Sequence, residues 1–470
     1  MVASSKALTI RMTADYARMQ SVFKIGVNLL CITIHKNNPK GGDTMKNHSV
    51  LSTLFVGIDV SSKNNVVCAI DFDQARHLQF SVQNNQPGAA TLVEKLSRFL
   101  VQNGKFTSLI IAMESTSFYG AHIATFLSSS VELMAFKPYV YCLNPKIVAN
   151  YKKSFVSIGK TDNIDAFVIA DFARVGKITT EPWRGSQYLA LQRLTRHRLH
   201  IANAIAREKL YMLSNMFLKF SELAVLKDGD GPFSNTFGAT ATAVLTDFLS
   251  TDDIVSMSTD DLVSFICEKS KNRFVDPQNT AKLLKQAARN SYRLDKCLYE
   301  PLTVSIASSF NCISAFESEV KTIDKAIEKA IKGLNTNEYQ CLLSIPGIGP
   351  VYAAGILAEI GSIKAFDSHD AIAKYAGLIW NPNQSGDFYA EDTNLSKAGN
   401  TYLRYYLIQA TNSVKNHASE YKDFYAKKFA EVKTHQHKRS LALTSRKLIR
   451  LIFGLLDKNQ LYSKGVGYLT

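Results

Sequence analysis

The chain has few cysteines, and they lack the spacing of a disulfide scaffold or a zinc module. There are seven, an odd number with no Cys-x-x-Cys pair, at positions 31, 68, 142, 267, 297, 312 and 341. Both kinds of site need closely spaced pairs. We therefore exclude them and expect a reducing environment, the bacterial cytoplasm.

The sequence also lacks an apolar run long enough to cross a membrane. The stretch 27–34 is interrupted by Asn28 and Thr33, and it is far shorter than the roughly 20 residues of a spanning helix. It has no small-residue cleavage site either, so we expect no membrane association. With 470 residues, of which 46% are hydrophobic and 20% charged, the chain is expected to fold into two to four domains.

Positive charge is in excess, and it is concentrated at the two ends of the chain. The net charge of the whole sequence is +15. Residues 1–50 carry seven bases and two acids, and residues 395–470 carry fourteen bases and four acids. The segment between them is neutral. Such a distribution predicts a localised anion-binding surface, for which nucleic acid is the natural partner.

The periodicity of apolar residues predicts a mixed sheet flanked by helices in the first part of the chain. We expect residues 1–44 to be a disordered extension. After it come expected strands at 54–60, 66–72, 78–82, 108–113 and 131–136, and helices at 87–101, 119–127, 145–153 and 164–174.

Long helices are expected after Pro182. Apolar residues spaced by three and four, from Leu191 to Met212, predict one helix. A strict heptad from Ile313 to Leu334 predicts a coiled coil, formed within the chain or between subunits. The residues between these helices, about 228–279, read as a polar insertion rich in loops. A glycine hairpin at 344–350 should join two short helices, and 401–456 should be helical with a basic and aromatic face.

Four carboxylates stand at the ends of predicted elements. Asp59 ends a strand in VGIDVSS, Glu114 ends another in SLIIAMES, and Asp162 and Asp165 open a helix in KTDNIDAF. Together such groups could hold two hard cations about 4 Å apart, as in phosphoryl transfer. Singly, each would more often be a helix cap or a turn residue.

Two further segments are candidates for chemistry or binding. Ser385 lies in the turn-rich WNPNQSGDF, where a Ser-Gly pair is usually only a turn. The segment LSKAGNTYLRYYL offers Lys397 and Arg404 to phosphates and Tyr402, Tyr405 and Tyr406 to bases. Alternatively, these tyrosines are core residues on a solvated helix.

The ordered blocks VGIDVSS, AMESTSFYG, GKTDNIDAFVIADFAR, SIPGIGPVYAAGILAEIG, KYAGLIWNPNQSG and LSKAGNTYLRYYL resemble the DEDD transposases of the insertion sequence 110 family. The resemblance runs from about Leu54 to the C-terminus. It implies an α/β domain of the RNase H fold, similar to Holliday-junction resolvases, followed by a helical coiled coil and a mostly helical transposase domain. We place these domains at 45–180, 181–335 and 336–470.

The resemblance also implies a mechanism and its residues. The four acidic positions of the family fall on Asp59, Glu114, Asp162 and Asp165, which would bind Mg²⁺, and its catalytic serine falls on Ser385. Family members act on donor and target DNA under the direction of a structured guide RNA. In the family, serine and carboxylates come from different protomers. For this chain we expect a dimer formed through the coiled coil and a tetramer at the synapse.

Two other functions remain open at this point. A structure-selective DNA nuclease would use the carboxylates alone, and a binding scaffold with a decayed site would have no activity. For nucleic-acid contacts we expect the phosphate-binding residues Arg184, Arg193, Arg196, Arg198, Lys397 and Arg404, with a steep salt dependence of binding.

Overall fold

The computed structural model describes residues 50–114, 118–155, 161–176, 178, 180–226, 230–334, 336–380 and 395–463, and the backbone of 384–385 and 388–389. The chain divides into two compact units. The first holds the described residues up to Ser186 and those of Gly361–Asp367. The second holds the described residues of Gln187–Ile360 and those from Ser368 onward. The extension expected over 1–44 lies outside the described residues.

The first unit is built on a five-stranded mixed sheet with the strand order β3-β2-β1-β4-β5. The central strand β1 pairs antiparallel with β2 and parallel with β4, while β2–β3 is antiparallel and β4–β5 parallel. The strands are β1 Thr53–Val60, β2 Asn64–Ile70, β3 Arg76–Gln83, β4 Ser108–Glu114 and β5 Pro138–Leu143. The mixed sheet expected from the sequence is confirmed.

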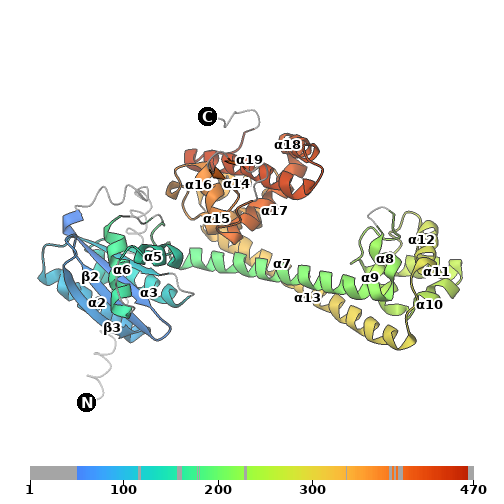
Figure 1. The fold of residues 1–470 in the computed structure, drawn as a ribbon, viewed down its shortest axis with the longest axis horizontal. Coiled ribbons are helices and arrows are strands. Elements are labelled where there is room, and N and C mark those ends of the chain that lie inside the picture. The colour runs from blue at the N-terminus through green and yellow to red at the C-terminus, as the bar shows by residue number, and fades with distance from the viewer. Residues whose placement is uncertain are drawn as a thin grey trace, which may run out of the picture. The chain divides into compact units, whose positions relative to one another are not determined.

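Helices cover both faces of this sheet (Figure 1). Alternate residues of β1 point to opposite faces: Leu54, Val56 and Ile58 pack with one helix layer, and Phe55 packs with the other. The first layer contains α2 Gln86–Gln102, α3 Tyr119–Ser128 and α4 Val131–Met134, and the second contains α5 Pro145–Lys152 and α6 Asp162–Arg174. The second layer positions the candidate site.

The strand expected at 131–136 is wrong. These residues form the short helix α4, and the strand β5 begins only at Pro138. A short apolar run does not distinguish helix from buried strand by its periodicity. Here the turn is made by Lys137, which adopts a positive φ of 48°, so the extended segment starts after it.

Two long helices form the spine of the second unit (Figure 1). They are α7 Ser186–Lys219 and α13 Lys296–Leu334. They run antiparallel: Lys209 Nζ lies 2.9 Å from Glu317 Oε1, and Asn215 Nδ2 donates to Ser305 Oγ over 3.0 Å. Of the two coiled-coil arrangements that the heptad left open, the structure therefore shows contacts between helices of one chain.

The buried stripe of α13 differs in part from the heptad. Ile313, Ile323 and Ile327 are buried as expected, whereas Val320 is only half-buried and Ile331, outside the heptad, is buried. A spacing of four residues after Ile323 and Ile327 keeps the stripe on one side of an α-helix with 3.6 residues per turn. The buried residues of α13 thus follow the spacing of a helix that packs inside a globular protein, not the strict heptad of a coiled coil.

The segment expected to be a polar insertion with many loops is instead a helical cluster, and it shares a hydrophobic core with α7 and α13. Its polar residues are largely helix caps: Ser250, Ser258 and Asp276 each accept a backbone N–H at the start of a helix. Between the caps, apolar residues such as Leu262 and Leu284 are fully buried. The helices are α8 Ser221–Val225, α9 Ala239–Asp247, α10 Thr251–Ser256, α11 Thr259–Ser270 and α12 Pro277–Asn290.

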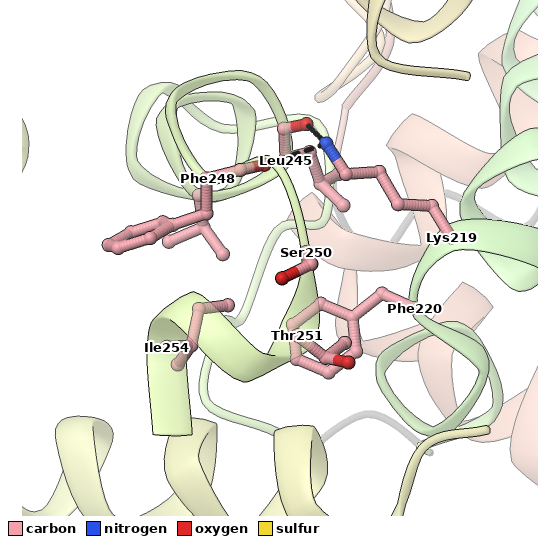
Figure 2. A pocket seen from close by; sticks show the side chains of 8 residues that line it. Lys219, Phe220, Leu245, Phe248, Ser250, Thr251 and Ile254 are labelled. Carbon is pink, nitrogen blue, oxygen red and sulfur yellow. Dashed lines mark hydrogen bonds between the residues drawn. The ribbon is translucent and has the colours of Figure 1, made fainter. Parts of the chain in front are cut away.

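A buried lysine ties this cluster to the spine (Figure 2). Lys219 is only 3% exposed, and its ammonium donates to Leu245 O (2.7 Å), Phe248 O (2.8 Å) and Thr303 Oγ1 (2.6 Å). Burial lowers the pKa of Lys219 to about 8. The adjacent cavity, of about 10 Å³, has room for no more than a water molecule. Lys219 therefore has a structural role.

Six helices complete the second unit: α14 Asn337–Leu343, α15 Pro350–Ile360, α16 His369–Tyr375, α17 Thr401–His417, α18 Ser419–Ala430 and α19 Gln436–Lys458. The turn between α14 and α15 contains Gly347 with a φ of 94°, which confirms the glycine hairpin. The short turns η1 Val50–Ser52 and η2 Ile363–Ala365 lie in the first unit. Across the described residues, no helix combines the length and apolar character that a membrane span requires.

Candidate active site

Two of the four predicted carboxylates stand at neighbouring strand ends. In the parallel pair of β1 and β4, Ile58 lies opposite Met113, and Asp59 and Glu114 are the next residues of their strands. Ile58 and Met113 belong to the core on the α2 and α3 side. Because side chains alternate along a strand, Asp59 and Glu114 point to the other face, which α6 covers.

The other two carboxylates open α6. Thr161 caps the helix by accepting the backbone N–H of Ile164, and Asp162 and Asp165 lie in the first turn. Three residues apart, they share one side of the helix, and the positive end of the helix dipole favours their charge. Asp162 is exposed and Asp165 is half-buried.

A glycine that the sequence analysis missed brings α6 onto β1. A Cβ built at Gly57 would lie 2.1 Å from the carbonyl oxygen of Ala166 and 2.4 Å from the nitrogen of Ala170. Only glycine permits helix and strand backbones to approach so closely. Gly57 shares its face of the sheet with Asp59, so this contact places the first turn of α6 beside that carboxylate. An isolated glycine within a strand pattern was the available signal.

The electrostatics of Asp59 show that the aspartates interact. Its pKa is raised from the ordinary value by burial, and further by the negative charges of Asp165 and Asp162, while Lys152 lowers it. The Lys152 ammonium forms an ion pair with Asp165. Sequence reasoning missed Lys152, which lies on α5 and supplies the positive charge that this acidic cluster would otherwise lack.

The donor set fits a hard cation in its chemistry. Carboxylate oxygens are the ligands that divalent cations such as Mg²⁺ use, and mutual repulsion at Asp59 is what a bound cation would relieve. In the described part of the chain, no three His, Cys, Asp or Glu side chains are already arranged to hold a metal. Lys152 instead pairs with one of the carboxylates.

Ser385 belongs to the second unit, in a two-stranded hairpin. Its strand β6 Gln384–Ser385 pairs antiparallel with β7 Phe388–Tyr389, with Ser385 opposite Phe388. The chain on either side of this hairpin is also paired. Trp380 bridges Leu395, Ser396 N donates to Ile379 O (2.8 Å), and Asn400 N donates to Tyr375 O (2.7 Å). We call the paired segments 375–380 and 395–400 the stem.

Buried polar groups hold the stem at its base. Asn400 Nδ2 donates to Glu359 Oε2 over 2.8 Å, and the Asn400 side chain also caps α17. The Glu359 side chain is only 1% exposed and pairs with Arg196, whose Nε and Nη2 donate over 2.7 and 2.9 Å. Arg404 Nη1 donates to Ala376 O and Lys397 O, one on each side of the stem.

The predicted phosphate-binding residues therefore differ in what they contact. Arg196 and Arg404 are engaged in and around the stem, and Arg198 pairs with Asp324 on α13 and donates to Tyr405 Oη. Arg193 and Lys397 are exposed, and Arg184 is half-buried. Their contacts with nucleic acid stay predictions, and the three engaged guanidinium groups have roles inside the fold.

Of the three tyrosines of α17, Tyr406 is a core residue, as in the second interpretation given above, whereas Tyr402 and Tyr405 are half-buried. Tyr406 is fully buried, and its hydroxyl donates to Thr195 O. Tyr405 packs against it, with the ring centroids 5.1 Å apart. The Arg196 guanidinium lies 4.4 Å from the centroid of the Tyr402 ring. At least Tyr406 is a core residue that no base can reach.

Two protein-family models match segments of this chain. A DEDD transposase model of the IS110 type matches residues 56–220, and a model described as the transposase IS116/IS110/IS902 family matches residues 339–426. The chain belongs to the IS110-type DEDD transposases. The two matches contain the predicted carboxylates and Ser385, respectively.

Three similar proteins come from insertion elements, and two of them match over nearly their full length. The uncharacterized 42 kDa protein of insertion element IS900 from Mycobacterium paratuberculosis is 23% identical over 87% of this chain and 97% of its own length. The uncharacterized 44.8 kDa protein of IS116 from Streptomyces clavuligerus is 21% identical over 87% and 96%. The transposase for element IS1111A from Coxiella burnetii is 26% identical over 37% of this chain and 44% of its own.

Membership in the family of IS110-type transposases indicates the class of reaction. The two transposase family models imply an enzyme that cuts and rejoins DNA, with DNA as the substrate. The DEDD match indicates an RNase H-like fold for the mixed sheet and suggests the use of a divalent metal.

Proposed function

We propose that this transposase moves an insertion element by attack of Ser385 on a DNA phosphodiester, assisted by Mg²⁺ that Asp59, Glu114, Asp162 and Asp165 hold. The observation that carries the proposal is that Asp59, at the end of β1, lies near the first turn of α6: its pKa is raised by burial and then by the charges of Asp165 and Asp162. An acid whose pKa is raised by burial and by neighbouring acids is typical of a functional site.

The chemical step is a transesterification. Ser385 Oγ forms a bond to phosphorus as one P–O bond of the DNA breaks, the serine proton passes to water, and the leaving oxygen takes a proton to become a hydroxyl. Attack by another strand's hydroxyl reverses these events and frees the serine. Bound Mg²⁺ would neutralise charge that develops on the phosphate oxygens.

The proposal includes a structured guide RNA and a homo-oligomer, a dimer that becomes a tetramer at the synapse. The resemblance stated above supports the RNA. For the oligomer, the support is that carboxylates and serine lie in separate compact units of the chain, as an active site shared between protomers would need. If the RNA is required, removing the non-coding DNA beside the gene should abolish insertion, and insertion at the parental frequency without it would rule the RNA out.

Cleavage of a plasmid that carries the element ends tests the carboxylates. In Mg²⁺ we expect Asp162→Asn to lower the cleavage rate by at least about 100-fold, because charge neutralisation at the phosphate is lost. Asp260→Asn is the matched control, since Asp260 is also an exposed aspartate in the first turn of a helix, α11. Parental cleavage by Asp162→Asn would refute the proposal.

A further inference from the structure

A group of aromatic rings, of which Tyr425 is half-buried and the other two are exposed, lies between the last two helices of the chain. The Tyr425 ring on α18 is 5.9 Å from the Phe429 ring and 6.0 Å from the His437 ring on α19, centroid to centroid. Tyr425 Oη and His437 Nδ1 are 2.7 Å apart. Phe429 is 37% exposed, and His437 is exposed as well. Three rings thus form a fixed group at the surface.

Lysines accompany these rings on α17, α18, α19 and the turn between the last two helices. Lys415 Nζ lies 4.4 Å from the centroid of the Tyr425 ring. Four more lysines, at positions 422, 427, 433 and 438, are exposed on α18, α19 and the turn between them. Among the described residues, none of these four makes an ion pair. We call the rings and these five lysines the aromatic–basic surface.

The acids of the same region do not cancel this charge. Glu431 is engaged by both Lys428 and Arg439, and Glu420 is engaged by Lys447. Each of these acids is therefore matched by a base outside the aromatic–basic surface. Only Asp423 remains against five lysines, so the surface offers a net positive field to an anionic partner.

Rings beside lysines fit unpaired nucleotides better than a duplex. A base can stack on a side-chain ring only when that face is not already stacked on its neighbour, and the lysines suit the phosphates of the same strand. Duplex DNA offers the lysines its phosphates but hides its base faces. The aromatic–basic combination therefore favours a single strand.

We propose that the aromatic–basic surface binds a single-stranded stretch of the DNA substrate, with a base stacked on Phe429. The proposal rests on the proposed function, because a transposase that cuts DNA exposes unpaired strand near the break. The sequence placed base stacking at Tyr402, Tyr405 and Tyr406, yet Tyr406 is in the core. Phe429 and His437 lie beyond residue 426, where the second family match ends.

Binding of labelled oligonucleotides by the full chain tests the proposal without any cleavage. For a single-stranded DNA of mixed sequence we expect Phe429→Ala to weaken binding about tenfold, the effect of losing one stacked base. Binding of the same sequence as a duplex should change less than twofold. Phe429→Trp, which keeps an aromatic face, should bind the single strand as the parent does.

The control is Tyr292→Ala, which removes an aromatic side chain that is 80% exposed but far in sequence from α18 and α19. It should leave binding of both DNAs unchanged. A second variant, Lys433→Gln with Lys438→Gln, should reduce the salt slope of single-strand binding by about 1.4, or about 0.7 for each lost phosphate contact. This second measurement holds even if Phe429→Ala lowers the melting temperature.

Equal losses for single strand and duplex, or no loss for either, would overturn the proposal. A loss confined to RNA of the same sequence would also overturn it and would assign the surface to RNA. These outcomes are separate from failure of the proposed function, which would appear as parental plasmid cleavage by Asp162→Asn with oligonucleotide binding intact.

Discussion

Asp59 is held in the fold at a cost to stability. Burial and the charges of Asp165 and Asp162 raise its pKa above the value of 3.8 that an ordinary aspartate has. The folded state therefore binds a proton at Asp59 more tightly than the unfolded state does, and stability falls as pH rises from 3.8 through the raised pKa. Above that range the full penalty of the ionised carboxylate remains.

Replacing the Asp59 carboxylate should raise the stability of the fold and abolish cleavage. Without divalent cations, we expect Asp59→Asn to be more stable than the parent at pH 7 by roughly 0.5–2 kcal/mol, the usual gain from optimising charge. The advantage should shrink towards pH 4, where the parental carboxyl is increasingly protonated. Urea denaturation at the two pH values measures the difference, and plasmid cleavage by the variant should be lost. A variant less stable than the parent at pH 7 would contradict the electrostatic account.

Gly57 should tolerate no side chain. Because a Cβ there would overlap the backbone of α6, we expect Gly57→Ala to push helix and strand apart and to destabilise the fold by roughly 2–4 kcal/mol. Cleavage should fall too, since Asp162 and Asp165 would move away from Asp59. Thermal unfolding and plasmid cleavage measure the two effects.

The control is Gly104→Ala, because a Cβ at Gly104 meets no atom within 4 Å. It should leave both stability and cleavage close to those of the parent. If Gly57→Ala melts at the parental temperature, the close approach of α6 to β1 does not place the aspartates.

At the scale of elements, the sequence predicted well wherever packing is regular. The strands β1, β2 and β4 carry continuous buried runs rich in β-branched residues, which favour a strand over a buried helix. The turn at Lys137 and the caps Ser250 and Ser258 were misjudged, since capping and turn geometry look the same as loop composition in a sequence. The site followed the same rule: strand ends revealed the carboxylates, but Gly57, Lys152 and Glu359 act through contacts between distant segments.

The stem that leads to the Ser385 hairpin depends on one buried carboxylate. Glu359 accepts from Arg196 and from Asn400, and it is a positioning residue in this account. We expect Glu359→Gln to destabilise the chain by up to about 3 kcal/mol, because the half-buried Arg196 charge loses its counter-charge. At a temperature where the variant is folded, cleavage should fall while binding of duplex DNA is kept.

Two further variants complete this test: a control on α13, and a double variant that replaces both members of the Arg196–Glu359 ion pair. Glu319→Gln removes an exposed glutamate of α13 and should change neither stability nor cleavage. The double variant Arg196→Met with Glu359→Leu should recover stability, since an apolar pair can replace a buried ion pair, but not cleavage, because Asn400 loses its acceptor. Parental cleavage by the double variant would show that the ion pair has no part in positioning the hairpin.

For the molecule as a whole, the parts of the proposed chemistry are divided. The carboxylates belong to the first compact unit, and Ser385 belongs to the second. Residues 395–470, which follow Ser385, carry fourteen bases against four acids, so the C-terminal part of the unit with the serine also holds most of the excess positive charge that attracts DNA. Neither the position of the carboxylates nor that of Ser385 distinguishes a transposase that holds DNA covalently from a nuclease that releases it.

A covalent adduct between the chain and its DNA is the most direct test of the account. A nicked substrate, from which the cleaved strand diffuses away, should trap the wild-type chain in Mg²⁺ as a protein–DNA band that survives denaturation. Ser385→Ala should form no adduct and cut no DNA, while Ser419→Ala, at an exposed serine of α18, should form as much adduct as the parent. Cleavage by Ser385→Ala at the parental rate, with free DNA ends, would contradict the account and identify a nuclease that uses the carboxylates alone.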